Sequence, residues 1–336
     1  MAASSGEGIE KLEDMIVRAA ESTAAHLRAA KAGIGGVIFG QERVVERALI
    51  TVLSGGHALL VGVPGLAKTK LVETMGIVLG LDARRIQFTP DLMPSDILGT
   101  EVLEESPGGK RSFRFIAGPV FAQLLMADEI NRASPRTQSA LLQAMQEQHV
   151  TVAGVRHDLP KPFHVLATQN PLEQEGTYPL PEAQLDRFLM QIDVDYPDLA
   201  AERRILFETT GAEETRPKAA MTAEDLIAAQ RLVRRLPVGE SVAESILALV
   251  RSARPGPEGG DIAKFIAWGP GPRASQALML AVRARCLLDG RFAPSVDDVL
   301  DLAAPVLKHR MALTFAARAD GETIDGVIKR LTTRMG

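Results

Sequence analysis

Two short segments of this sequence have the residue types and spacing of a site that binds phosphate. The first is the loop Gly62-Val63-Pro64-Gly65-Leu66-Ala67-Lys68-Thr69, which follows the apolar run 57–61 and precedes apolar residues at helical spacing. In a strand, loop and helix of this kind, backbone N–H groups and the helix N-terminus face the phosphates. Lys68 would reach the β- and γ-phosphates and Thr69 would hold Mg²⁺. The loop departs from the usual G-x-x-x-x-G-K-[ST] at one position, because Ala67 precedes the lysine.

The second segment is the acidic pair Asp128-Glu129, which ends the apolar run 121–127. Two like charges at the end of a buried strand are costly unless a cation lies nearby. Coordination of Mg²⁺ by Asp128 would meet that cost, and Glu129 could then orient and activate an attacking water. The alternative is that the pair only begins a solvent loop, but the phosphate loop upstream favours the metal site.

Three further residues could read or neutralise a phosphate. Asn170 follows the predicted strand 163–168 and could position water against a γ-phosphate, although asparagine before a proline also suits a plain turn. Arg187 lies on a predicted short helix and could reach a neighbouring subunit's phosphate, or could be a solvated, ion-paired arginine. Arg273 begins a predicted helix, where a basic residue opposes the helix dipole unless a phosphate is close.

The elements that must position these residues alternate between strands and helices up to about residue 196, which predicts a mostly parallel sheet with its ligand at the strands' carboxyl ends. The predicted strands cover residues 57–61, 85–89, 121–127, 163–168 and 190–194. Two β-hairpins are expected, at 100–116 and 149–162, and residues 90–99 are expected to be loop or broken helix.

Helical patterns dominate after residue 197, and another covers residues 9–31. The later patterns cover residues 198–210, 222–236, 240–254, 272–289, 295–306 and 321–334. We therefore predict an α/β protein with a P-loop core, a mostly parallel five-stranded sheet and β-hairpin inserts, followed by a small all-α lid domain. The expected divisions are an N-terminal helical segment at 1–32, the core at 33–196 and the lid at 197–336.

Composition limits the other function classes. The single cysteine, Cys286, excludes a disulfide within the chain and a cysteine-based zinc site. The six histidines lack metal-ligand spacing, and His57 and His164 read as structural groups at strand starts. A net charge of −4 and an aromatic content of 4% give no reason to expect nucleic-acid binding. With no secretory signal and no apolar run of about 18 residues, we expect a cytoplasmic protein without membrane insertion.

Taken together, the chain resembles AAA+ ATPases, and specifically the MoxR family, over about residues 33–310. The resemblance is carried by residues 37–41, 62–69, 126–133, 167–171, 173–188 and 272–274. The run Glu175-Gly176-Thr177-Tyr178-Pro179-Leu180-Pro181-Glu182-Ala183-Gln184-Leu185-Asp186-Arg187-Phe188 is its most specific part. An alanine before the loop lysine is similar to MoxR proteins, so Ala67 supports the resemblance.

The resemblance implies a role for each candidate residue. Lys68 and Thr69 would be Walker A residues, Asp128 and Glu129 Walker B, Asn170 sensor 1, Arg187 the arginine finger and Arg273 sensor 2. Residues 37–41, with Ile38 and Gln41, would border the adenine. The hairpins would be the helix-2 and presensor-1 inserts.

The resemblance also implies ATP and Mg²⁺ bound between core and lid, with Asn170 and Arg273 reading the γ-phosphate and Arg187 acting on the next subunit of a hexameric ring. ATP hydrolysis would remodel or mature protein complexes, together with partners that bear von Willebrand factor A domains. Two alternatives stay open at this point: a nucleic-acid motor of the same clade, and a nucleotide-gated scaffold that does not hydrolyse.

Overall fold

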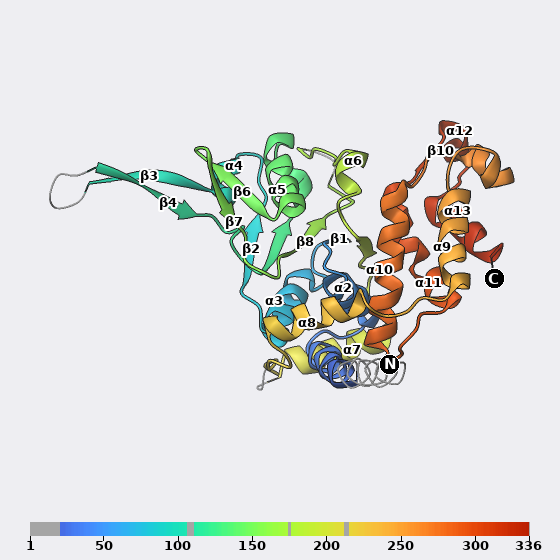
Figure 1. Cartoon of the computed structure of the whole chain (residues 1–336), viewed down its shortest axis with the longest axis horizontal. Helices are drawn as coiled ribbons and strands as arrows, with labels where there is room; N and C mark the ends of the chain where they lie inside the picture. The colour runs from blue at the N-terminus through green and yellow to red at the C-terminus, as the bar shows by residue number, and fades with distance from the viewer. Residues whose placement is uncertain (1–20, 106–110, 174–175, 212–214, 336) are drawn as a thin grey trace, which may run out of the picture.

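The computed structural model describes residues 21–105, 111–173, 176–211 and 215–335. An α/β core lies beside a bundle of helices, and a long hairpin projects from the core (Figure 1). Residues 21–35 are helical, and the earlier part of the predicted helix at 9–31 lies outside the described residues.

The centre of the core is a five-stranded sheet in the order β2-β5-β8-β1-β9, with every neighbouring pair parallel. The strands are β1 (Ala58–Val61), β2 (Ala83–Gln87), β5 (Leu124–Asp128), β8 (His164–Gln169) and β9 (Met190–Asp193). The inner strands are almost wholly buried, which explains why they read as continuous apolar runs in the sequence. The predicted α/β fold with a mostly parallel sheet is confirmed.

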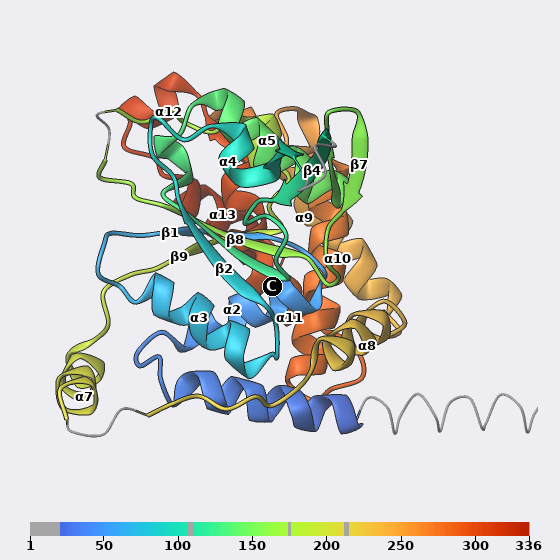
Figure 2. The same ribbon diagram turned by 90° about the vertical axis from the view of Figure 1, so that its left-hand side faces the viewer.

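Helices cover both faces of this sheet (Figure 2). On one face α2 (Glu42–Leu53) and α3 (Lys68–Val78) pack against Leu60 and Met126. On the other face α4 (Pro94–Leu98) and α5 (Pro135–Glu147) pack with Leu125 and other residues of opposite strand parity. Because side chains alternate along a strand, two separate apolar cores fix the register of every strand.

Two hairpins extend from the core, as expected. The longer one pairs β3 (Gly99–Glu105) with β4 (Arg111–Ala117), and the shorter pairs β6 (His149–Val152) with β7 (Val155–Asp158). Phe115 of the longer hairpin stacks on His157 of the shorter, with ring centroids 3.8 Å apart. The two hairpins therefore touch at their bases.

The rest of the chain is mainly helical. Its helices are α7 (Leu199–Thr209), α8 (Ala223–Val233), α9 (Glu240–Ser252), α10 (Pro272–Leu288), α11 (Val296–Leu307), α12 (Phe315–Ala319) and α13 (Ile324–Thr333). A two-stranded antiparallel ribbon pairs β10 (Ile266–Trp268) with β11 (Ala312–Leu313), and the sequence patterns did not indicate it. The 3₁₀ segment η2 (Pro257–Phe265) precedes β10, and the 3₁₀ segment η3 (Lys308–Arg310) precedes β11.

These helices do not form one group. Helices α9, α10, α11 and α13 form a bundle beside the sheet, in which α10 contacts α2 and α11 contacts β9, and α8 contacts both α2 of the core and α10. The amide of Gln230 on α8 donates to Val52 O at 2.8 Å and so ties α8 to the core. In the part of the chain that is described, no helix is long and apolar enough to span a membrane.

Candidate functional site

The loop between β1 and α3 is shaped by residues with unusual backbone demands. A Cβ atom on Gly62 would lie 2.5 Å from the backbone oxygen of Val194, the residue after β9, so only glycine fits this close approach. Gly65 has φ +83°, and Ala67, at the N-cap of α3, also adopts a left-handed conformation with φ 56°. The loop therefore turns tightly and presents the N-terminus of α3 to the carboxyl edge of the sheet.

Lys68 is the first residue of α3, directly after this loop. Its ammonium group donates to Gly62 O at 2.6 Å and to Val63 O at 2.7 Å. Burial lowers the pKa of Lys68, while the nearby carboxylates of Asp128 and Glu129 act in the opposite direction. An ammonium group that donates to backbone carbonyls beside two acids is positioned to donate to phosphate oxygens in place of those carbonyls.

Asp128 ends β5, with its carboxylate held on both oxygens. Thr168 of the neighbouring strand β8 donates its hydroxyl to Asp128 Oδ1 at 2.5 Å. Arg85 of β2 donates from Nε and Nη2 to Asp128 Oδ2 at 3.1 and 2.6 Å. The buried acid is thus fixed in place, and it has a cationic partner at the position where a metal ion would be favourable.

Glu129 follows directly and has a left-handed backbone, with φ 55°. Such a conformation costs about 1–2 kcal/mol for a residue with a side chain and is common at functional sites. Its N–H donates to Thr168 Oγ1 at 2.8 Å. Its carboxylate accepts from Gln87 Nε2 at 2.6 Å and from Arg132 Nη1 at 2.9 Å, so the side chain is aimed and not free.

The structure brings most of the predicted site residues into one cavity of about 400 Å³. Its lining consists of residues 64–70, Asp128, Glu129, Thr168 and Asn170. Asn170 Oδ1 accepts from the N–H of Leu172 at 3.1 Å, which orients the amide group. The carboxylate of Asp128 and the hydroxyl of Thr69 are hard oxygen donors, so this set fits Mg²⁺ bound together with a phosphate chain.

A larger cavity of about 890 Å³ adjoins the same loop. Its walls include residues 36–39, Gln41, the loop residues 64–67 and several residues of α7. Ile38 is buried here, and the amide of Gln41 donates to Asp195 O at 2.8 Å. Residues 37–41 therefore lie where a base attached to the phosphates would extend, and α7 forms the facing wall.

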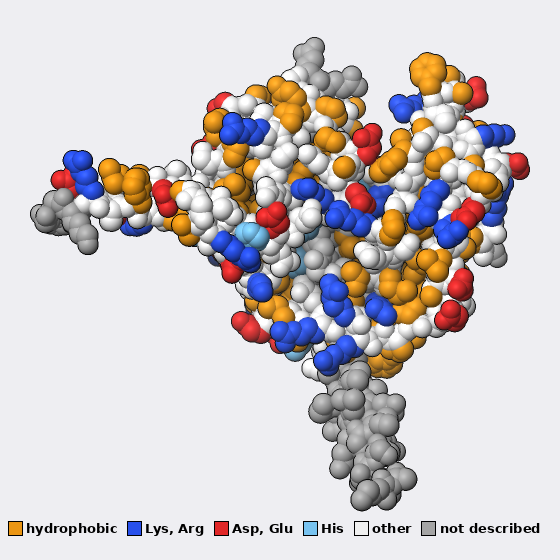
Figure 3. Space-filling model, turned by 45° about the horizontal axis from the view of Figure 1, so that its top comes forward, with side chains coloured by type: hydrophobic (Ala, Val, Ile, Leu, Met, Phe, Trp, Pro, Cys, Tyr) orange, Lys and Arg blue, Asp and Glu red, His pale blue; other side chains and the backbone are white. Residues whose placement is uncertain are grey.

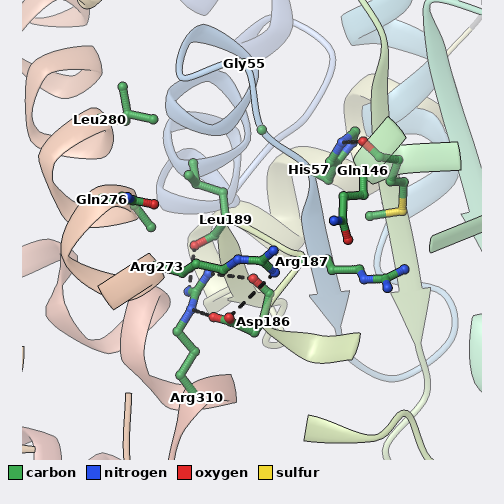
Figure 4. A pocket seen from close by; sticks show the side chains of 13 residues that line it. Gly55, His57, Gln146, Asp186, Arg187, Leu189, Arg273, Gln276, Leu280 and Arg310 are labelled. Atoms are coloured by element: carbon green, nitrogen blue, oxygen red, sulfur yellow. Dashed lines mark hydrogen bonds and ion pairs between the residues drawn. The ribbon is translucent and has the colours of Figure 1, made fainter. Parts of the chain in front are cut away.

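Arg187 and Arg273 lie elsewhere, in a third cavity of about 260 Å³ at the junction of the core and α10 (Figure 4). Arg310 and Asp186 also line it, and Arg273 Nη1 lies 3.8 Å from Asp186 Oδ2. This cavity and the one around Lys68 share no lining residue. Within one chain, Arg273 is therefore grouped with Arg187 and not with Asn170. Figure 3 shows basic side chains around the hollow between the core and the helices.

The two histidines at strand starts are buried and fully hydrogen-bonded. His57 accepts from the N–H of Val165 at 2.9 Å and contacts Met145 O at 3.3 Å. His164 bonds Gly56 O at 2.8 Å and Gln230 Nε2 at 3.0 Å. Burial lowers the pKa of His57 to about 3 and that of His164 to about 4, so both are neutral and structural. Among the described residues, no group of three or more His, Cys, Asp or Glu is placed to bind a metal.

Comparison with known proteins agrees with this geometry. Residues 57–190 match the family described as ATPases associated with various cellular activities (AAA), and residues 261–331 match the AAA lid domain. The chain is 43% identical over 297 residues to Chaperone MoxR1 of Mycobacterium tuberculosis, an alignment that covers 88% of this chain and 78% of that protein. It is 33% identical over 309 residues to Protein MoxR of Paracoccus denitrificans, covering 86% and 89%. The chain belongs to the MoxR family of AAA+ ATPases.

The MoxR-family fold is shared with a protein of known structure. The crystal structure of a candidate ATPase from Cytophaga hutchinsonii matches with a TM-score of 0.87 and 34% sequence identity, and covers 98% of each chain. Nucleotide binding is what membership of this ATPase family implies, and the cavities beside Lys68 and Gln41 offer the space for it.

Sequence reasoning missed four residues of this MoxR-family site: Arg85, Gln87, Arg132 and Thr168. Arg85 and Gln87 alternate with the buried Ile86 along β2, which was the one available signal that they share a face. Their targets could not be known, because the pairing of β2 with β5 sets Gln87 opposite Asp128. Thr168 stands on β8, two positions before Asn170, and faces the end of β5.

Proposed function

We propose that this chain hydrolyses ATP with Mg²⁺ as a hexameric ring and uses the reaction to remodel or mature partner protein complexes. The supporting observation is the convergence of Lys68, Thr69, Asp128, Glu129 and Asn170 on one cavity, next to a second cavity large enough for a nucleoside. Phosphoryl transfer depends on positioning and charge neutralisation more than on covalent chemistry, and this set supplies both.

The roles follow from the contacts. Lys68 and the N-terminus of α3 bind the β- and γ-phosphates, and Thr69 with Asp128 would hold Mg²⁺, which supplies charge neutralisation when bound. Glu129 accepts the proton of the attacking water, because Gln87 and Arg132 aim its carboxylate at the cavity edge. Asn170 orients that water through its side-chain amide.

Arg187 and Arg273 act on the nucleotide of a neighbouring subunit. Both line a cavity separate from the one around Lys68, and both are side chains that stabilise developing negative charge when brought to a γ-phosphate. A site completed by the next copy requires a head-to-tail assembly, which closes into a ring when the rotation permits.

The projecting hairpins are the surfaces we assign to the protein client. Leu103 and Phe113 of the β3–β4 hairpin are exposed, and the hairpin carries hydrophobic side chains along its length in Figure 3. The stacking of Phe115 on His157 would transmit movement between the two hairpins. An adaptor with a von Willebrand factor A domain is proposed on family resemblance alone.

Steady-state ATPase and nucleotide-binding assays test the active site. Lys68→Ala should abolish nucleotide binding, whereas Glu129→Gln should retain binding and lose turnover by about 100-fold or more. Glu73→Gln, an exposed carboxylate on α3, is the matched control and should behave as wild type. Full turnover in Glu129→Gln would contradict the assigned role of this acid. If Glu129→Gln binds ATP without turnover, affinity capture with this variant held in ATP would identify the client.

Mixing subunits tests action between chains. Rings formed from Lys68→Ala and Arg187→Ala chains contain interfaces at which an intact phosphate loop meets an intact arginine. We expect each variant alone to be inactive and the mixture to recover part of the wild-type ATPase rate. No recovery in mixed rings of confirmed assembly would exclude Arg187 as a residue that acts in trans.

A further inference from the structure

The segment Lys308-His309-Arg310 forms η3 after α11, and it is hydrogen-bonded to the loop that carries Arg187. Arg310 is only 2% exposed, yet all three nitrogens of its guanidinium group donate hydrogen bonds. Nε donates to Asp186 Oδ1 at 2.7 Å, and Nη2 donates to Phe188 O at 2.6 Å and to Asp186 O at 3.3 Å. Nη1 donates to Leu189 O at 3.1 Å and to Val306 O at 2.6 Å. Thus four of its five acceptors belong to the loop 186–189.

His309 adds a further contact to the same loop. Its Nε2 lies 3.0 Å from Phe188 O, and burial next to Arg310 holds the pKa of His309 well below its usual value. The imidazole is therefore neutral and donates from Nε2 to the carbonyl. Two consecutive side chains of the helical region thus fix the backbone immediately after Arg187.

Asp186 is shared between two arginines. Its Oδ1 accepts from Arg310, and its Oδ2 lies 3.8 Å from Nη1 of Arg273 on α10 (Figure 4). One carboxylate thus faces both α10 and η3, and it precedes Arg187 in the chain. With three arginines and one acid lining it, the cavity has a net positive charge suited to phosphate.

A purely stabilising role explains this arrangement poorly. A buried ion pair is weak support for stability, because desolvation of both charges offsets their attraction, and its best-attested use is to fix one geometry among alternatives. An arginine that only held the helices together could satisfy its donors with carbonyls of the helical bundle. Among the described residues, Val306 supplies the only acceptor for Arg310 from the helical region.

We propose that Arg310 and Asp186 are positioning residues, which hold Arg187 and Arg273 together in the geometry that meets the phosphate of a neighbouring subunit. The helical bundle would thereby control the arginines that its own subunit offers to the next site. This inference rests on the proposed function, because it requires Arg187 to act in trans.

The experiment uses Asp186→Asn, which preserves shape and removes the charge shared by the two arginines. We expect nucleotide affinity at the variant's own phosphate loop to stay unchanged and kcat to fall by about 10- to 100-fold, the scale of a small misplacement of a catalytic group. Mixed with Lys68→Ala chains, Asp186→Asn should regain ATPase activity. Mixed with Arg187→Ala chains, it should regain none, because both defects lie on the same side of the interface.

Two further variants serve as a second test of the positioning role and as a control. Arg310→Lys retains the charge but cannot span five acceptors, and should show the same one-sided complementation if Asp186→Asn fails to fold. Asp325→Asn removes another ion pair of the same segment, to Lys308 at 2.7 Å, without touching the loop of Arg187, and should leave ATPase activity as in wild type. Thermal unfolding and ring assembly are measured for every variant.

The outcomes separate this inference from the proposed function. If Lys68→Ala and Arg187→Ala chains complement each other but Asp186→Asn and Arg310→Lys are fully active, or are rescued by Arg187→Ala chains, the positioning role is wrong and the trans mechanism stands. If Lys68→Ala and Arg187→Ala chains fail to complement each other, both proposals fall together.

Discussion

Replacing Arg85 by glutamine should raise the apparent affinity of the nucleotide site for Mg²⁺. Arg85 donates two hydrogen bonds to the Oδ2 atom of Asp128, the carboxylate that we assign to the metal. A cation that binds Asp128 must therefore compete with the guanidinium for that oxygen. Glutamine keeps a polar side chain on β2 and removes the competing charge.

The size of the effect follows from the exposure of the pair. The Arg85 side chain is 49% exposed and that of Asp128 is 13% exposed, so the interaction is weaker than a fully buried ion pair. A charge-assisted pair of this kind contributes about 1 kcal/mol. Since 1.4 kcal/mol corresponds to a tenfold change, the Mg²⁺ concentration at half-saturation should fall about fivefold.

The assay measures binding and not turnover. A fluorescent ATP analogue is titrated with Mg²⁺ in a Glu129→Gln background, with and without the Arg85 change. Arg84→Gln is the matched control, because this neighbouring arginine pairs with Asp82 at 3.5 Å and not with Asp128. An unchanged or higher Mg²⁺ requirement in Arg85→Gln would refute the reasoning and would mean that Arg85 helps to hold Asp128 for the metal.

Two other perturbations test the phosphate loop and the buried core. Ala67→Gly should stabilise the protein by about 1 kcal/mol in urea unfolding, because glycine adopts φ 56° without strain, whereas Gly65→Ala, at φ +83°, should destabilise it. His164, with its pKa lowered to about 4 from 6.5, resists protonation in the folded state, so stability falls as the pH drops below 6.5. At pH 5 this histidine accounts for a loss of about 2 kcal/mol. His164→Asn should flatten the pH profile of urea unfolding and the exposed His26→Gln should not; equal slopes would contradict a neutral, buried His164.

Much of the fold could be predicted because its signals are local. Buried strands of a parallel sheet appear as short apolar runs, and alternation with helical patterns predicts the α/β core. The bounds of the elements differ in places: the strand expected at 85–89 is found at Ala83–Gln87, and it does not extend further because Pro90 has no N–H to continue the ladder. The ribbon of β10 and β11 was missed because strands of three and two residues show no periodicity.

The candidate site likewise contains residues that the sequence could place and contacts that it could not. Asp128 ends β5, Asn170 directly follows β8, and Lys68 follows β1 after the loop 62–67, so a parallel sheet brings them to one edge regardless of strand order. The contacts of Arg85 and Gln87 depend on which strands are neighbours, and this is a tertiary property that no single segment contains.

The position of Arg273 shows the limit of local reasoning most clearly. A basic residue at a helix start suggested a phosphate nearby, and the resemblance to AAA+ ATPases implied that Arg273 reads the γ-phosphate together with Asn170. Packing of α10 instead sets Arg273 beside Asp186, next to Arg187, in a cavity apart from Lys68. Where a helix docks depends on its whole apolar face, so its first residue cannot reveal its partner.

This separation has a consequence for how such a ring would work. In the proposed assembly, α10 and η3 of one subunit hold the arginines that enter the next subunit's site, while α7 of that next subunit walls the pocket beside its phosphate loop. When the γ-phosphate is lost, the arginines of the neighbouring subunit would lose their anionic partner and could change position. Because Asp186 and Arg310 link these arginines to η3, that movement would reach the neighbour's helical bundle. Sequential coupling around the ring would thus need no contact between two nucleotides. It would need only that the position of the helical bundle in one subunit depends on whether the nucleotide site of the adjacent subunit is occupied.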